Sequence, residues 1–241
     1  MTRRFLILSF AVGLLALGGL NAQATQIDIT SGAGLDNFVP PPSDNFAIVG
    51  NLKFSDFNYT QSPTGSPPSA HNVTVSSFTS VPGEPGIDFG GVFTAAAMTT
   101  VDYHIFFTVS TTDGSLINDA YLKLGGFGFN GVPPGGTGTG SATIKEDITD
   151  AKGNAITTSP LLFQVFSPSS PTTLTVSLLT PETTILVEKD IIVNGGDNGA
   201  SFSIINQGFS TVPEPASMAL LGIGLSGLFA LRRLFRRTSV A

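Results

Sequence analysis

Cysteine and tryptophan are absent from this chain of 241 residues, and charge is scarce. The sequence has 0 cysteines, 0 tryptophans and 2 histidines, and only 12% of its residues are charged. Without cysteine there is no disulfide, no thiolate metal ligand and no cysteine nucleophile. Two histidines also argue against a histidine-rich zinc centre. The composition predicts no cofactor and leaves the stability of the fold to its apolar core.

Arginine is missing from the whole middle of the chain. It occurs only as Arg3 and Arg4 at the start and in a cluster near the end, whereas five lysines stand against sixteen acidic residues between Thr25 and Thr211. A segment with this excess of negative charge repels phosphate backbones. The charge distribution therefore excludes nucleic acid as a partner and places the basic residues where membrane targeting uses them.

The N-terminus has the three parts of an export signal. The two arginines precede the uncharged apolar run Phe5–Leu20, and Ala22-Gln23-Ala24 supplies the small-x-small pattern that signal peptidase recognises. The alternatives are a transmembrane anchor or a buried first helix, but glycines interrupt the run and polar sequence follows it at once. We expect a signal peptide over residues 1–24, with Ala22 and Ala24 as the residues that signal peptidase recognises.

The C-terminus combines a second apolar run with the basic cluster. Ala216–Leu231 is sixteen residues long, which as a helix rises about 24 Å against a hydrocarbon core of about 30 Å. Long arginine side chains can reach the headgroups from a short helix. We expect a single transmembrane helix, with Arg232, Arg233, Arg236 and Arg237 as a cytoplasmic stop-transfer cluster.

Immediately before this run stands Pro213-Glu214-Pro215. The two prolines hold Glu214 in an extended backbone and prevent an earlier helix start. Taken alone, this is a stiff linker. Together with the apolar helix and the terminal arginines, Val212 to Arg237 resembles the PEP-CTERM sorting signal of exported proteins in exopolysaccharide-producing bacteria.

The resemblance implies processing by an exosortase, a membrane enzyme that cuts near the Pro-Glu-Pro motif and then releases or re-anchors its substrate. Pro213, Glu214 and Pro215 would be recognition residues of a substrate, and the sorting signal would span residues 212–241. Signal peptidase, exosortase, the membrane and exopolysaccharide are the partners that the two signals imply. The tail says nothing about the activity of the domain that it delivers.

Residues 25–211 have the pattern of one all-β domain, because short alternating runs are separated by Gly, Pro, Asn and Asp. In the clearest run, Val101, Tyr103 and Ile105 face one side while Asp102 and His104 face the other. The predicted strands are Leu52–Thr60, Val73–Phe78, Val101–Val109, Leu116–Leu124, Ala142–Thr149, Leu161–Ser167, Thr173–Leu179, Thr184–Val193 and Ala200–Ile205.

About ten short strands without helices predict an antiparallel β-sandwich, Ig-like or jelly-roll-like, between the signal helix and the transmembrane helix. A β-solenoid is the alternative, although no repeat period is evident. Asp150–Asn154 is expected to form a hairpin turn.

Motifs for catalysis and ligands are weak in the sequence. Gly126–Gly131 matches G-x-G-x-x-G, but prolines follow where a dinucleotide site needs a helix, so we expect a loop. His104 beside Asp102 fits a partly exposed strand histidine better than a hydrolase triad. Glu188 and Asp190 share a face, but Lys189 and the turn that follows indicate a solvated strand end. The loops Asp147–Asn154 and Asn194–Asn198 are calcium candidates that lack the EF-hand pattern.

Two classes of function remain. The first is a non-catalytic surface or extracellular-matrix protein, which the sequence favours. The second is a module that binds carbohydrate or another surface, with calcium as a candidate aid. Binding of sugars needs exposed aromatic side chains, for which the sequence offers Tyr59, Tyr103 and Tyr121 as amphipathic candidates. An enzyme ranks below both.

Overall fold

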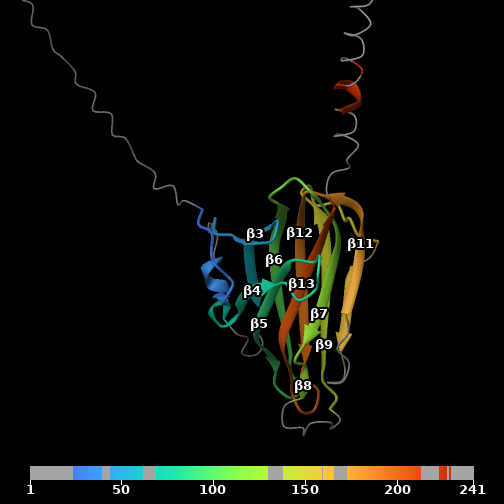
Figure 1. The fold of residues 1–241 in the computed structure, drawn as a ribbon. Coiled ribbons are helices and arrows are strands. Elements are labelled where there is room, and N and C mark those ends of the chain that lie inside the picture. Colours follow the sequence, from blue (N-terminus) through green and yellow to red (C-terminus); the bar gives the residue numbers. More distant parts are fainter. Residues whose placement is uncertain are drawn as a thin grey trace, which may run out of the picture.

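A computed structural model describes residues 24–39, 44–61, 69–129, 138–158, 160–165, 173–212, 223–226 and 228. Its strands form two antiparallel sheets packed face to face (Figure 1). The seven-stranded sheet contains, in spatial order, β1 (Ala33–Gly34), β4 (Thr74–Phe78), β5 (Gly86–Ala95), β13 (Ala200–Val212), β7 (Leu116–Gly125) and β11 (Thr173–Glu182), with β8 (Gly128–Phe129) paired to β13. The six-stranded sheet contains β10 (Leu161–Val165), β9 (Ser141–Asp150), β12 (Thr184–Asn194), β6 (Thr100–Thr111), β3 (Leu52–Gln61) and β2 (Ala47–Val49).

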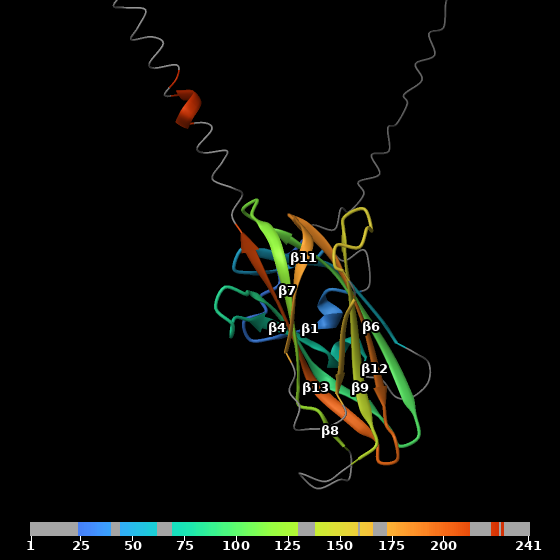
Figure 2. The same cartoon turned by 90° about the vertical axis from the view of Figure 1, so that its right-hand side faces the viewer.

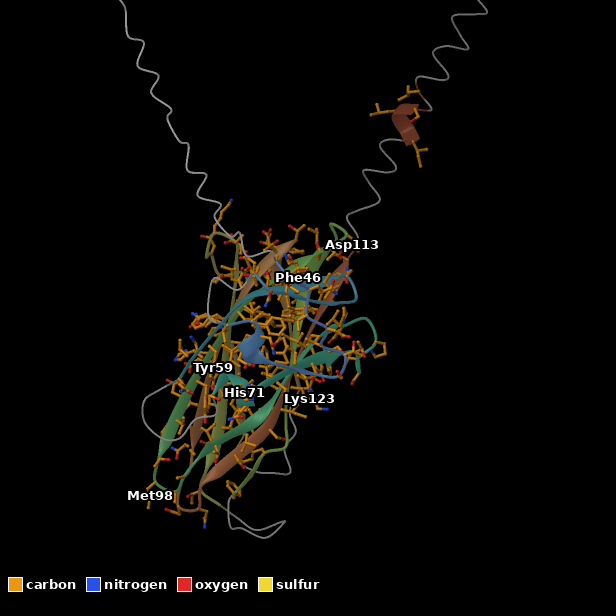
Figure 3. All side chains as sticks on the ribbon, turned by 90° about the vertical axis from the view of Figure 1, so that its left-hand side faces the viewer. Phe46, Tyr59, His71, Met98, Asp113 and Lys123 are labelled. Atoms are coloured by element: carbon orange, nitrogen blue, oxygen red, sulfur yellow. The ribbon has the colours of Figure 1, made fainter. Side chains whose placement is uncertain are left out.

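The strand order is that of a jelly roll. β5 pairs with β13, β6 with β12, β7 with β11 and β9 with β10, so the pairs nest inside one another along the chain. The connections from β5 to β7 and from β10 to β13 cross from one sheet to the other at each step. Figure 2 shows the two sheets from the side, with β7 and β13 in one and β6 and β12 in the other. This arrangement is the double Greek key of jelly-roll sandwiches. The turns lie at the two ends of the sandwich, where Met98 and Asp113 mark opposite ends in Figure 3.

Phenylalanine fills the space between the sheets. Phe57 lies 4.8 Å from Phe38, 5.7 Å from Phe107 and 6.5 Å from Phe89 between ring centroids, so it joins both sheets. Aromatic pairs at these distances add about 0.5–1.5 kcal/mol each beyond the burial of their area. A core of this kind stabilises a sandwich that has no disulfide.

All nine predicted strands are present, although residues 166 and 167 of the predicted strand Leu161–Ser167 lie outside the described residues. The sandwich prediction is confirmed in its jelly-roll form, whereas the β-solenoid alternative was wrong. The hairpin turn at Asp150–Asn154 is also confirmed. Asp150 accepts hydrogen bonds from the backbone N–H groups of Lys152 and Asn154, and Gly153 has a positive φ of 85°. Strand β5 was not predicted, because its three glycines obscure the alternation of Ile87, Phe89 and Phe93.

The interpretation of Lys189 as part of a solvated strand end was wrong. Its side chain is fully buried between the sheets, where it donates hydrogen bonds to Glu146 Oε2 and Gln207 Oε1. Gln207 Nε2 also donates to Glu146 Oε1 at 3.3 Å. Burial lowers the pKa of Lys189 and the carboxylate of Glu146 opposes this effect. Because Glu146 and Lys189 lie in the six-stranded sheet and Gln207 in the other, this cluster is a polar bridge across the core.

The predicted signals lie mostly outside the described residues. Ala22 belongs to that undescribed part, and so do the Pro-Glu-Pro motif and the arginine cluster at residues 232–237. Ala24 is exposed, and the first described hydrogen bond of the domain joins the Phe46 N–H group to the carbonyl oxygen of Thr25, the residue that cleavage after Ala24 would expose. Residues 223–226 are helical, and within the described residues no helix is long and apolar enough to cross a membrane.

Candidate functional site

The outward side of the six-stranded sheet gathers the chemically active side chains of the domain. Alternate residues of β9, β12 and β6 point away from the core, and the antiparallel register aligns them in rows. Lys145, Asp190 and His104 form one row, while Asp147, Glu188 and Phe106 form the next. We call this surface the outer face.

Asp102, His104 and Asp190 form a compact cluster on the outer face. One ligand atom from each lies within 4.8 Å of the others, and Asp102 Oδ2 is 3.5 Å from His104 Nε2. Asp102 Oδ1 and Asp190 Oδ1 are both shielded from solvent and accept no hydrogen bond from the residues that the structure describes. The histidine ring lies parallel to Phe106, with centroids 6.2 Å apart and an interplanar angle of 12°. The predicted half-exposed His104 beside Asp102 is therefore confirmed, and β12 adds a third group.

The electrostatics of this cluster reflect crowded negative charge. Burial raises the pKa of Asp190, and the neighbouring carboxylate of Asp102 raises it further. The nearest lysine, Lys145, contacts Asp147 at 2.5 Å, and this hydrogen bond raises the pKa of Lys145. A carboxylate oxygen that is shielded from water and has no hydrogen-bond partner is costly, and Asp102 and Asp190 each have one such oxygen.

A pocket of about 230 Å³ opens on the same face, beside the cluster. Its lining combines apolar surface from Phe106 and Leu186 with hydroxyl groups from two threonines and three carboxylates. The lining residues are Asp56, Phe106, Phe107, Thr108, Asp147, Thr149, Leu186, Val187 and Glu188. An apolar floor with a few polar groups around it is the usual composition of a small-molecule site.

A β-bulge shapes one wall of this pocket. The register between β3 and β6 shifts between Ser55 and Asn58, and Asp56 within the shift adopts a positive φ of 55°. The extra residue turns Phe57 into the core and leaves Asp56 exposed at the pocket. Non-glycine residues in this conformation are uncommon, and bulges often occur beside binding sites.

The three tyrosines do not form the exposed aromatic patch that sugar binding would need. Tyr103 is fully buried, and its hydroxyl group donates to the carbonyl oxygen of Thr94 at 3.1 Å. Tyr121 is 8% exposed and stacks on Phe78, while Tyr59 packs half-buried against the core at the position labelled in Figure 3. Two phenylalanines line the pocket: Phe106 is partly exposed, whereas Phe107 is buried.

The other sequence candidates are turns and strands. Both oxygens of Asp150 already accept hydrogen bonds within the hairpin turn, including one from Asn154 Nδ2 at 2.7 Å. Asn194 Oδ1 accepts a hydrogen bond from the N–H group of Gly196 in the second calcium candidate. In the G-x-G-x-x-G segment, Gly128 begins strand β8, and residues 130–137 lie outside the described residues. Neither loop presents a set of free oxygens in the part that the structure describes.

Sequence reasoning placed Asp190 on the same face as Glu188, but it missed the pairing of Asp190 with His104 and the pocket. The alternation within β6 places His104 and Phe106 on one side of their strand, but it does not indicate which strand lies next to it. Asp190 lies 86 residues after His104 in the chain, and only the β6–β12 register sets it directly opposite His104. The bulge at Asp56 leaves no recognisable signal, because aspartate is ordinary in turns and exposed strands.

The fold and the outer face define a jelly-roll β-sandwich with an acidic, partly apolar pocket on one sheet. The family model described as "PEP-CTERM protein-sorting motif" matches residues 211–237. The C-terminal part of the chain thus carries a PEP-CTERM sorting motif, which implies export and sorting to the cell surface.

Similar solved structures are distant in sequence. They include TmCBM61 in complex with β-1,4-galactotriose, at 13% identity and a TM-score of 0.31 over 66% of this chain and 90% of that chain. Another is the enzymatically active domain of tailspike protein 4 from bacteriophage CBA120, at 16% identity and a TM-score of 0.31 over 64% and 19% of the two chains. A third comes from a study of promiscuous carbohydrate-binding modules of the β-sandwich superfamily, at 12% identity and a TM-score of 0.29 over 65% and 56%. No curated protein matches the chain.

Proposed function

We propose that this chain is a non-catalytic protein of the cell surface or extracellular matrix, sorted and processed by an exosortase. In this proposal residues 1–24 are a cleaved signal peptide, residues 25–211 are the exported sandwich, and residues 212–241 are the sorting signal. The tail helix holds the protein in the membrane until the exosortase acts on Pro213, Glu214 and Pro215. The arginines at 232, 233, 236 and 237 stay on the cytoplasmic side.

The observation that carries this proposal is the match to the sorting motif at residues 211–237, which begins where the fold ends. Strand β13 is paired on both sides and stops at Val212, directly before the Pro-Glu-Pro sequence. A cut at or after Pro213 therefore removes no paired strand of the sandwich. The geometry suits a domain that is cut free of its tail without losing stability.

Replacing the motif by the triple variant P213A/E214Q/P215A is expected to abolish processing. Intact-mass measurement of surface and secreted protein should show wild-type chains that lack residues 1–24 and the tail, and any added mass would come from an anchor. The triple variant, and the wild type in a strain without exosortase, should keep Arg232–Ala241. Glu182→Gln, which changes a glutamate at the end of β11, serves as the control and should be processed normally. Tails retained in the wild type with the enzyme present would contradict the proposal.

A second candidate function is binding of exopolysaccharide on the outer face, and the pocket beside Phe106 favours it. Sugars offer an apolar C–H face that packs on an aromatic ring and hydroxyl groups that donate to carboxylates. Phe106, Leu186, Asp147 and Glu188 supply both kinds of contact within one pocket. This function needs no catalytic residue, so it is compatible with the sorting proposal.

Phe106→Ala is expected to weaken binding to the host exopolysaccharide at least tenfold, because it removes the aromatic wall of the pocket. Affinity electrophoresis of the purified protein in gels containing the polysaccharide measures the effect. Leu179→Ala is the matched control, since Leu179 is 61% exposed on β11 of the other sheet. Equal retardation of both variants and the wild type would exclude the pocket as the binding site.

A further inference from the structure

We infer that Asp102, His104 and Asp190 bind a divalent transition-metal ion of the Zn²⁺ type on the outer face. The three ligand atoms lie within 4.8 Å of one another. A small movement of the side chains would therefore bring all three atoms into contact with one ion. Zn²⁺ binds imidazole nitrogen and carboxylate oxygen at about 2.0–2.2 Å. This inference concerns the cluster alone and is independent of any polysaccharide in the adjacent pocket.

Two oxygen atoms without partners support the inference separately from the proximity of the three groups. Asp102 Oδ1 and Asp190 Oδ1 are shielded from water, and within the described part of the chain neither accepts a hydrogen bond. Buried polar atoms in native proteins nearly always have a partner, so we expect a hydrogen-bond donor or a cation beside each of these oxygens. Lys145 does not fill this role here, because its ammonium group contacts Asp147 at 2.5 Å. A cation between the two aspartates would satisfy both oxygens at once.

The scaffold is suited to holding ligands in place. Asp102 and His104 are two residues apart on β6, and Asp190 lies opposite His104 on β12 in an unbroken register from Thr184 to Asn194. The parallel contact with Phe106 orients the imidazole ring. Sites on regular strands are more exactly placed than sites on loops, and three protein ligands leave coordination positions for water.

The donor set favours a transition metal over calcium. Ca²⁺ takes six to eight oxygen ligands, whereas imidazole nitrogen together with carboxylates suits Zn²⁺ and its neighbours in the first transition row. The competing explanation is a proton shared between Asp102 and Asp190, which would give both oxygens a hydrogen-bond partner without a metal. Titration of the protein with metal ions distinguishes the two.

The test is isothermal titration of the purified full-length chain, first treated with EDTA, with Zn²⁺ and separately with Ca²⁺. The wild type is expected to bind one Zn²⁺ per chain and to bind Ca²⁺ at least tenfold more weakly. His104→Gln and Asp190→Asn should each weaken Zn²⁺ binding at least tenfold. His71→Gln is the matched control, because His71 forms an exposed pair with Asp36 at 2.9 Å and is labelled in Figure 3; it should bind like the wild type.

A second readout separates loss of the site from loss of the fold. Excess Zn²⁺ should raise the midpoint of thermal unfolding of the wild type and of His71→Gln, and should leave the midpoint of the two site variants unchanged. Asp102→Asn provides a further site variant with the same expectation. The proposal is overturned if the wild type binds no stoichiometric Zn²⁺, if the site variants bind as the wild type does, or if His71→Gln alone loses binding. Tighter binding of Ca²⁺ than of Zn²⁺ would overturn the choice of metal.

Discussion

Replacing Lys189 by methionine is expected to lower the free energy of unfolding by about 3–5 kcal/mol. Lys189 and Glu146 are both fully buried, and each holds the other through a direct hydrogen bond. Methionine fills a similar volume but leaves the Glu146 carboxylate in the core with Gln207 as its remaining polar partner. The cost of an uncompensated buried charge exceeds the gain from an added apolar side chain. Urea denaturation followed by circular dichroism measures the loss.

Lys145→Met is the matched control for this substitution. It removes an ion pair with Asp147 on the same strand, β9, but both side chains are about 40% exposed, so the expected loss is below about 1 kcal/mol. The triple variant K189M/E146L/Q207L removes the whole polar bridge and should regain most of the stability lost by K189M. Apolar side chains at all three positions leave no charged or polar group in the core without a partner. If Lys189→Met is as stable as the wild type, the polar bridge does not stabilise the domain.

Gly86→Ala is expected to destabilise the sandwich by about 3 kcal/mol. A Cβ atom at Gly86 would lie 1.8 Å from the carbonyl oxygen of Gln207 and 2.7 Å from Cα of Gly208. Both atoms belong to the backbone of β13, so no side chain can rotate away, and the β5–β13 pair must separate locally. The midpoint of urea denaturation should fall accordingly.

Gly128→Ala tests whether the effect of Gly86→Ala comes from the close approach. Gly128 also lies in a strand that pairs with β13, but a Cβ atom there meets no atom within 4 Å and its φ is not in the left-handed region. We expect a change within about 0.5 kcal/mol. Equal losses in the two variants would mean that the spacing between β5 and β13 is not the cause.

The sequence predicts strands well where inward and outward residues differ in polarity. Val101–Val109 alternates throughout, and β6 follows that alternation residue by residue. The same rule failed at Lys189, because a lysine in an alternating strand is normally taken to face water. Its inward position depends on Glu146 one strand away and Gln207 in the opposite sheet, neither of which a local pattern can indicate.

The candidate site shows the same limit more strongly. The pattern within β6 correctly placed Asp102 and His104 together on a half-exposed side of a strand. Asp190 and the carboxylates of the pocket join them only through pairings between β6, β12 and β9, which bring together residues from distant parts of the sequence. The sorting tail, by contrast, was predictable because all its parts are contiguous in the sequence.

The nested strand order also has a consequence for the time at which this domain can fold. β13 is the final strand of the chain, yet it occupies the middle of the seven-stranded sheet, between β5 and β7. While the chain is synthesised from its N-terminus, β5 and β7 keep open edges until residue 212 has emerged, and pairing across such distances is slow. The last strand and the sorting tail then emerge one after the other. The sandwich can therefore be completed only when β13 is available, and the sorting motif follows β13 directly in the chain. Completion of the fold and exposure of the sorting motif thus occur close together in time.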